Sequence, residues 1–277
     1  MVRIVTDSSA LYTQEEAKEL GFAASPLSIV IDEWQGEDLQ MDMDRFYGMI
    51  QEGKIPQSSQ PAIGIVMDAY EAYPEDDIIN ITMADGLSGT YQSACGVKTM
   101  VDNKEKITVF NSQTLCGPHR YMIQEAVKMA ISGKTKEEIL SFLEEVRDNT
   151  DSFLVPQDFS FLRRGGRLTP LAATFGSVLK LKPILRITPD GKRLDKHGVK
   201  RTVTSVAASI AKNLEQHKLD EKHILYICHA NVLRDACKMK EVFMEKFPKV
   251  EIQMLELSPA FVTQGGPGCI AIQYVKK

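Results

Sequence analysis

The sequence lacks long apolar runs and an excess of basic residues, and these absences exclude two classes of protein. Its longest apolar stretches, such as residues 224–228, have the length of a strand and fall far short of the roughly 20 residues that span a bilayer. We therefore expect no membrane span, and the polar sequence after Thr6 predicts no signal peptide. A formal net charge of -4 at pH 7 argues against nucleic acid as the main partner.

Paired cysteines and metal-ligand patterns are also missing. The 5 cysteines are scattered, with no C-x-x-C spacing, and we expect most of them to be small buried residues in a reducing cytoplasm. Histidines and carboxylates show no metal-ligand spacing, and the chain has no Walker loop and no nucleophile–base pair. The sequence therefore predicts no metal, no cofactor and no catalytic residue.

The length of the chain favours two domains. At 277 residues it is long for a single core, and its 43% hydrophobic and 25% charged residues are average for a soluble globular protein. We predict an N-terminal α/β domain over residues 1–150 and a C-terminal α/β domain over residues 151–277.

Strands and helices alternate along the first half, which predicts a doubly wound parallel sheet. The expected strands cover residues 2–6, 26–31, 77–82 and 107–111. Several of them end in polar residues, for example Asp7-Ser8-Ser9, and ligands of open α/β sheets bind outside those ends. In the second half, we predict a hairpin of residues 182–188 and 193–196 around the turn 189–191.

Three polar clusters carry the functional argument. They are residues 58–61 (SSQP), 86–93 (GLSGTYQS) and 163–168 (RRGGRL), and each is expected at a junction that leads into a helix. Hydroxyls and backbone N–H groups at helix starts favour anions, and an arginine supplies matching charge in a forked geometry. The pattern indicates a module that holds an anion and breaks no bond.

Each cluster also has a purely structural interpretation. Ser58, Ser59 and Ser88 are good helix caps, and Gly165-Gly166 suits a tight turn. The segment around Ser88 fails the G-x-S-x-G spacing of a serine hydrolase. Two other functions remain open: an enzyme, such as a phosphotransferase or hydrolase using the same crevice, and a regulatory module for another carboxylate or phosphate ligand.

Together, the clusters resemble the DegV family of bacterial fatty-acid-binding proteins. The resemblance runs in order through Val5–Ala10, Ser58–Pro61, Leu87–Ala94, Leu162–Leu168, Lys180–Leu185 and Gly266–Gly268. It implies two α/β domains with one long-chain fatty acid buried between them. Such proteins present the acid to a separate fatty-acid kinase, which makes acyl phosphate for phospholipid synthesis, and are themselves carriers without catalysis.

The resemblance also implies which residues bind the ligand. The carboxylate-binding groups fall on a hydroxyl of Ser58 or Ser59, on Ser88 with its neighbours Gly89 and Thr90, and on Arg167 and Arg201. The late family loop T-H-x-G-P-G falls on Thr263–Gly268.

This chain departs from the family pattern at two of those positions. Ser58 stands where threonine is common, and Gln264 stands where histidine is usual. Glutamine can hydrogen-bond a headgroup but cannot titrate near neutral pH. The glutamine at position 264 therefore puts in question the expectation that this protein works with a fatty-acid kinase.

Overall fold

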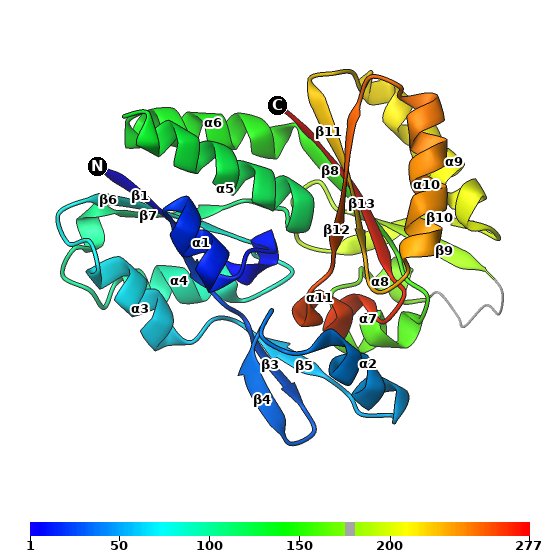
Figure 1. Cartoon of the computed structure of the whole chain (residues 1–277), viewed down its shortest axis with the longest axis horizontal. Coiled ribbons are helices and arrows are strands. Elements are labelled where there is room, and N and C mark those ends of the chain that lie inside the picture. The colour runs from blue at the N-terminus through cyan, green and yellow to red at the C-terminus, as the bar shows by residue number, and fades with distance from the viewer. Residues whose placement is uncertain (175–180) are drawn as a thin grey trace. The chain divides into compact units, whose positions relative to one another are not determined.

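The computed structural model describes residues 1–174 and 181–277 (Figure 1). The helix predicted for residues 171–179 falls partly outside these ranges, and within them only α8 (Pro170–Ala173) is formed. The chain divides into two compact units, of which unit 1 contains Met1–Asp148 and Ser258–Thr263. Unit 2 contains Asn149–Leu257 and Gln264–Lys277.

Unit 1 contains the predicted parallel sheet. Its strands are β1 (Val2–Asp7), β2 (Ala23–Ser25), β6 (Asp77–Thr82) and β7 (Ile107–Asn111). They lie in the order β2-β1-β6-β7, and every pairing is parallel. Because β2 and β6 flank β1 on opposite sides, the sheet is doubly wound, and the prediction for this half is confirmed.

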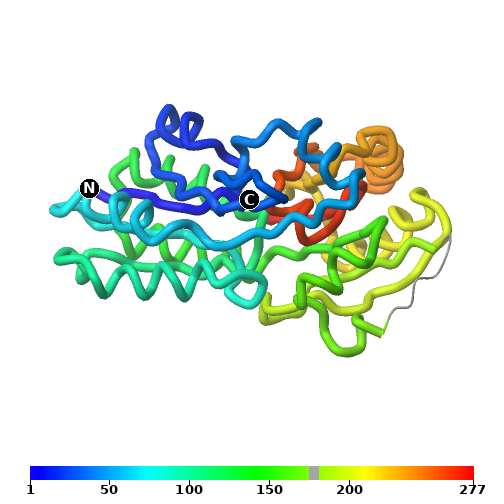
Figure 2. The backbone as a smooth tube through the Cα atoms, turned by 90° about the horizontal axis from the view of Figure 1, so that it is seen from below, coloured from blue at the N-terminus to red at the C-terminus, as the bar shows by residue number. Residues whose placement is uncertain are grey.

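Helices cover both faces of this sheet. In Figure 1, α3 (Ile63–Glu71) and α4 (Thr90–Lys98) lie on one side of it. On the other side lie α5 (Cys116–Ile131) and α6 (Lys136–Asp148). Side chains from the sheet and from α3 and α4, including Val5, Ile78, Tyr70 and Val97, form a buried cluster. The path of the chain through unit 1 can be followed in Figure 2, from blue at the N-terminus to green.

The first helix follows directly from local sequence. After the short 3-10 helix η1 (Ser8–Ala10), α1 (Gln14–Leu20) begins with a capping box of Thr13 and Glu16, which the T-x-x-E spacing of these residues predicts. The Thr13 hydroxyl accepts from the Glu16 amide at 3.1 Å, and the Glu16 carboxylate accepts from the Thr13 amide at 2.9 Å. These reciprocal bonds satisfy amide groups that the helix itself leaves without partners.

A small antiparallel sheet in unit 1 was not predicted. It consists of β3 (Ser28–Ile31), β4 (Trp34–Glu37) and β5 (Gln57–Ser59) in the order β4-β3-β5. A strand does form within residues 26–31, as β3, but it does not join the parallel sheet as predicted. The additional strand of that sheet is Ala23–Ser25. Between β4 and β5 lies α2 (Met43–Gln51), which Asp42 caps as expected.

Unit 2 contains a six-stranded mixed sheet. Its strands are β8 (Thr150–Val155), β9 (Lys182–Ile187), β10 (Leu194–Lys200), β11 (His223–His229), β12 (Glu251–Glu256) and β13 (Ile270–Lys276). Their order is β10-β9-β8-β13-β11-β12, and only β11 and β12 pair in parallel. The predicted hairpin is confirmed as β9 and β10. The helices α9 (Val203–Leu214) and α10 (Leu233–Lys246) contribute Ile210 and Phe243 to the core.

One segment returns from the C-terminal half to unit 1. Residues 258–263, at the start of α11 (Pro259–Gly265), belong to unit 1, although the predicted boundary assigned them to the C-terminal domain. The reason is a tertiary contact, because the buried Asp38 carboxylate accepts hydrogen bonds from the Ser258 hydroxyl and the Ala260 amide. No local sequence pattern announces such a contact.

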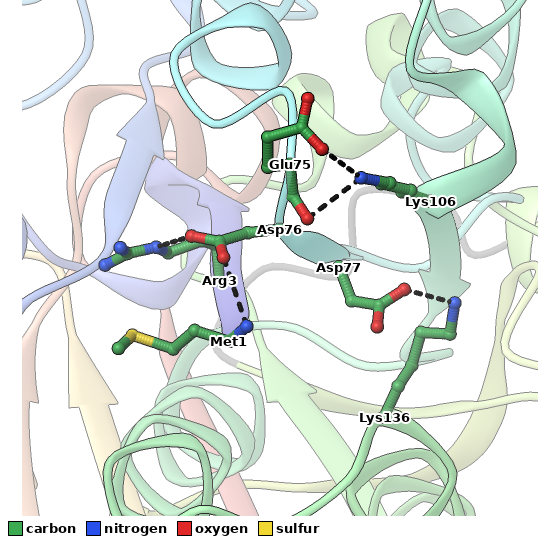
Figure 3. A network of polar contacts seen from close by, with 7 residues as sticks. All are labelled: Met1, Arg3, Glu75, Asp76, Asp77, Lys106 and Lys136. Atoms are coloured by element: carbon green, nitrogen blue, oxygen red, sulfur yellow. Dashed lines mark hydrogen bonds and ion pairs between the residues drawn. The ribbon is translucent and has the colours of Figure 1, made fainter.

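Ion pairs gather at the amino ends of β1 and β6 (Figure 3). Asp76 accepts from the Met1 amino group at 3.1 Å and from the Arg3 Nε at 2.8 Å, and Lys136 pairs with Asp77 at 2.7 Å. These side chains are partly exposed, so solvent screens each pair and its contribution to stability is small. The network lies at the opposite end of the strands from their polar carboxyl-terminal tips.

A buried hydroxyl in unit 1 provides a test of this packing. The Tyr70 hydroxyl accepts from the Asn80 amide at 2.7 Å, and Tyr70 is fully buried. We expect Tyr70→Phe to lower the free energy of unfolding by about 1–3 kcal/mol, because the Asn80 amide then lacks its partner. Tyr73→Phe is the matched control, since Tyr73 is 39% exposed. Urea denaturation measures both, and equal stability of the two variants would contradict the assigned bond.

Candidate functional site

The polar tip of β1 is internal to unit 1. Asp7, Ser8 and Ser9 are each 1% exposed. Asp7 accepts from the Ser9 and Met83 amides, both at 2.9 Å, so it fixes the backbone that leaves β6. The Ser8 hydroxyl donates to Asp38 at 2.8 Å. The side chains of this tip thus join neighbouring loops of unit 1.

A Ser–His pair lies beside that tip, contrary to the prediction of none. Ser9 Oγ lies 2.9 Å from His119 Nδ1, and His119 Nε2 lies 3.1 Å from the carbonyl oxygen of Ile81. The carbonyl can only accept, so Nε2 carries the proton and Nδ1 accepts from the serine hydroxyl. Burial lowers the pKa of His119, which keeps the ring neutral. Because His119 is 0% and Ser9 1% exposed, no substrate reaches this pair.

Ser88 belongs to the loop that opens α4, as predicted. Its hydroxyl lies 2.8 Å from the Thr90 hydroxyl and accepts from the Thr90 amide at 3.3 Å. Gly89 occupies the cap position and provides no side chain to the helix start. Ser88 is partly exposed, Gly89 is exposed and Thr90 is buried. The start of α4 thus combines a hydroxyl pair with helix-start amides, a combination that favours anions.

The first two polar clusters meet at Gly89. A Cβ built on Gly89 would lie 2.6 Å from Oε1 of Gln60, so the Gln60 side chain lies directly on this glycine. Sequence reasoning placed both clusters at the site but did not single out Gln60. The sequence signal that could have identified Gln60 was its position next to Ser59.

Ser58 and Ser59 are strand residues and cap no helix. They lie on β5, where Ser58 pairs with Ile29 and Ser59 pairs with Ser28. α3 begins only at Ile63 after Ala62, which makes no side-chain cap. The capping interpretation of the two serines was therefore wrong, although the cluster does lead into a helix, as predicted. Ser58 is partly exposed and Ser59 is exposed.

The arginine cluster lies at the end of a helix that was not predicted, and α8 follows it, as expected for a junction that leads into a helix. α7 (Phe159–Gly165) contains Arg163 and Arg164 in its last turn, and it ends at Gly166 with a φ of 69°. The Asp158 carboxylate, which accepts from the Ser160 amide at 2.8 Å, caps the start of α7. Because Arg163 and Arg164 lie at the other end of this helix, what they offer an anion is positive charge.

Arg167 and Gln264 are brought together around Gly165 in unit 2. The Arg167 guanidinium donates to the Gly165 carbonyl, and partial burial lowers the pKa of Arg167. A Cβ on Gly165 would collide with Oε1 of Gln264 and would lie 3.9 Å from Cδ of Arg167. Glycine is required at this position because the glutamine side chain covers it.

Thr263 and Gln264 lie in the last turn of α11, although a loop was predicted. Thr263 is 7% exposed, and its hydroxyl donates to the Pro259 carbonyl at 2.8 Å. The turn that follows has left-handed backbone at Gly266 and Gly268, with φ values of 82° and 77°. Arg201 is exposed just before α9.

Two further findings concern the residues that the structure describes. Within 1–174 and 181–277, no group of histidine, cysteine or acidic side chains is placed to hold a metal ion. In the same ranges, no helix combines the length and the apolar character needed to cross a bilayer.

Comparison with known proteins agrees with these clusters. A family model described as "Uncharacterised protein, DegV family" matches residues 1–277. The chain belongs to the DegV family. It is 32% identical over 283 residues to a DegV domain-containing protein of Halalkalibacterium halodurans, with 100% of this chain and 99% of the relative covered.

Solved DegV structures have the same fold. DegV from Bacillus subtilis, described as a fatty acid binding protein, matches with a TM-score of 0.85 at 29% identity, with 100% of this chain and 99% of that chain covered. A DegV family protein from Thermus thermophilus matches with a TM-score of 0.88 at 24% identity, with the same coverage. The predicted family and fold class are confirmed.

The contact of Gln264 with Gly165 is testable in this DegV chain. We expect Gly165→Ala to lower the free energy of unfolding by about 1 kcal/mol, because the new methyl group displaces the glutamine. In a Gln264→Ala background the same substitution is expected to be neutral or stabilising, since alanine is favoured over glycine in a helix. A double-mutant cycle in urea measures the coupling, and additive effects would show that the two side chains act independently.

Proposed function

We propose that this protein is a non-catalytic carrier that binds a long-chain fatty acid. The observation that carries the proposal is the match over the whole chain to Bacillus subtilis DegV, which is described as a fatty acid binding protein. A polar, hydroxyl-rich helix start and a positively charged turn are what a carboxylate requires. Both occur here, at Ser88–Thr90 and at Arg167.

The candidate headgroup residues are the nine that the family motif indicates. They are Ser58, Ser59, Ser88, Gly89, Thr90, Arg167, Arg201, Thr263 and Gln264. Among them, Ser88 has the strongest support, because its hydroxyl and the first amides of α4 are adjacent. Arg167 adds a full positive charge, and its fork can bond both oxygens of a carboxylate.

The acyl chain is the main source of affinity in this proposal. At about 0.8 kcal/mol for each buried methylene, a 16-carbon tail contributes roughly 12 kcal/mol before ordering costs. A single neutral hydrogen bond to the carboxylate contributes far less, about 1.5–3 kcal/mol. The polar residues therefore set the orientation of the ligand.

A hydrolase or phosphotransferase is the less favoured alternative. The one Ser–His pair identified above is buried, which leaves it without access to a substrate. We further propose that the bound acid is presented to a separate fatty-acid kinase for acyl phosphate formation. In that role the protein supplies recognition, and the kinase supplies the phosphoryl chemistry.

The carrier proposal predicts a bound lipid. We expect protein purified from a bacterial host to release about one long-chain fatty acid per chain, because burial of the tail makes dissociation slow. Denaturation, organic extraction and mass spectrometry measure the acyl content. Absence of acyl chains, together with no saturable binding of added palmitate, would overturn the carrier proposal.

A serine variant separates headgroup recognition from tail burial. Ser88→Ala is expected to weaken palmitate binding about 10-fold to 100-fold, which corresponds to one hydrogen bond to a charged group. Ser141→Ala, on the exposed face of α6, is the matched control and is expected to bind like the wild type. Unchanged affinity of Ser88→Ala would remove Ser88 from the headgroup site.

Gln264 determines the expected behaviour with a kinase. Because glutamine cannot act as an acid or base near pH 7, we expect slow acyl phosphate formation by the wild type with a kinase from a related bacterium. Gln264→His is expected to raise the rate with little change in lipid affinity. Transfer from labelled ATP at equal lipid loading measures this, and kinase binding is measured in parallel. Full activity of the wild type would show that the histidine is dispensable.

A further inference from the structure

Asp38 is a buried acid that the function described so far does not use. It follows β4 in unit 1 and is 2% exposed. Its backbone amide donates to the Leu27 carbonyl at 2.7 Å, which fixes the turn that carries it. None of the sequence patterns pointed to this residue, because nothing local distinguishes it from other acids in loops.

Side chains and amides from two distant segments converge on the Asp38 carboxylate. Oδ2 accepts from the Ser8 hydroxyl at 2.8 Å and from the Ser258 hydroxyl at 2.9 Å. Oδ1 accepts from the Ala260 amide at 3.0 Å. Ser258 and Ala260 stand at the beginning of α11. Asp38 therefore caps the start of α11 from a distant part of the chain, as a local residue caps other helices.

The far end of α11 carries two of the proposed ligand-binding residues. Thr263 and Gln264 lie in its last turn, and the Thr263 hydroxyl is bonded to Pro259 within the helix. In a helix this short, its first turn and its last turn move together. The position of Ser258 and Ala260 on Asp38 thus fixes where Thr263, which belongs to the same unit, is presented.

We propose that Asp38 is a positioning residue for ligand binding, which holds α11 in place through its carboxylate. The inference rests on the proposed fatty-acid-binding function only where palmitate affinity is measured. The docking of residues 258–260 on Asp38 is a property of unit 1 itself.

The charge of Asp38 makes this docking sensitive to pH. Burial raises the pKa of Asp38 to about 6, although hydrogen bonds from Ala260, Ser8, Ser258 and Leu39 oppose the shift. In the described part of the chain, no cation forms an ion pair with it. A small pocket adjoins Asp38, and its other titratable lining groups are Tyr12, Glu15 and Glu37. Asp7, beside Ser8, is bonded to backbone amides.

The sign of the effect follows from the raised pKa. When α11 leaves Asp38, the carboxyl group is solvated and its pKa returns toward 3.8. The docked state therefore holds its proton over a wider pH range than the undocked state. The stabilisation of docking by the proton is complete below about pH 4 and is lost as the pH rises through about 6. Acidification toward pH 5 favours docked α11.

Two variants of Asp38 separate the cap from the charge. Asp38→Ala removes the acceptor, and we expect hydrogen exchange at the amides of Ala260 and Phe261 to accelerate about tenfold or more at pH 7. Asp38→Asn can still accept from Ala260 and can donate to the two serines, so it imitates the protonated acid. For this variant we expect exchange at least as slow as in the wild type at pH 7.

Ligand binding and a pH series complete the experiment. Palmitate affinity is expected to fall several-fold in Asp38→Ala and to be preserved in Asp38→Asn. At each pH, the exchange rate of the wild type is divided by that of Asp38→Asn. This ratio is expected to approach one as the pH is lowered from 7 to 5. Glu33→Gln, an exposed acid between β3 and β4, controls for loss of a nearby charge. Ser258→Ala removes a single donor and serves if Asp38→Ala fails to fold.

The outcomes distinguish this inference from the carrier proposal. If the wild type binds palmitate and neither Asp38→Ala nor Ser258→Ala changes exchange or affinity, the positioning role is wrong. The same holds if Asp38→Asn and the wild type give one constant ratio at every pH. If no protein binds palmitate but exchange at α11 responds to Asp38 as described, docking stands and the carrier proposal fails.

Discussion

The hydrogen bonds at the tip of β1 organise unit 1. Asp7 fixes the residues that follow β6, Ser9 bonds to His119 of α5, and Ser8 bonds to Asp38. Asp38 in turn holds the beginning of α11. Because these groups are buried, each bond that is lost leaves a polar atom without water or partner, at about 1–3 kcal/mol. The loops that carry the candidate site thus share a common anchor at the carboxyl end of one strand.

The candidate site itself repeats a simple contact in both units. Gln60 lies on Gly89 in unit 1, and Gln264 lies on Gly165 in unit 2. In each case a glycine permits an amide side chain to approach the backbone of a candidate binding loop. A glutamine amide both donates and accepts, so it can hold a loop and remain able to bond a headgroup oxygen. These two glycines are therefore required for space, whereas the neighbouring Gly166 is required for its left-handed backbone.

The buried Ser–His pair shows why burial matters in the assignment of function. The two side chains have the distance and the proton arrangement of a nucleophile and its base. Ser9 and His119 are nevertheless nearly or fully inaccessible, and the pair connects β1 to α5. A Ser–His pair that has suitable geometry but no access to a substrate is a structural contact.

The sequence by itself determined the family, the parallel sheet of unit 1, the capping box at Thr13, and the loop that opens α4 at Ser88. These features depend on hydrophobic periodicity and on residues a few positions apart, which local patterns record. Tertiary structure decided the pairing of Ser58 and Ser59 in a β-strand and the return of residues 258–263 to unit 1. It also decided the role of Asp38. Each of these depends on partners far apart in the chain, and only folding brings such groups within hydrogen-bonding distance.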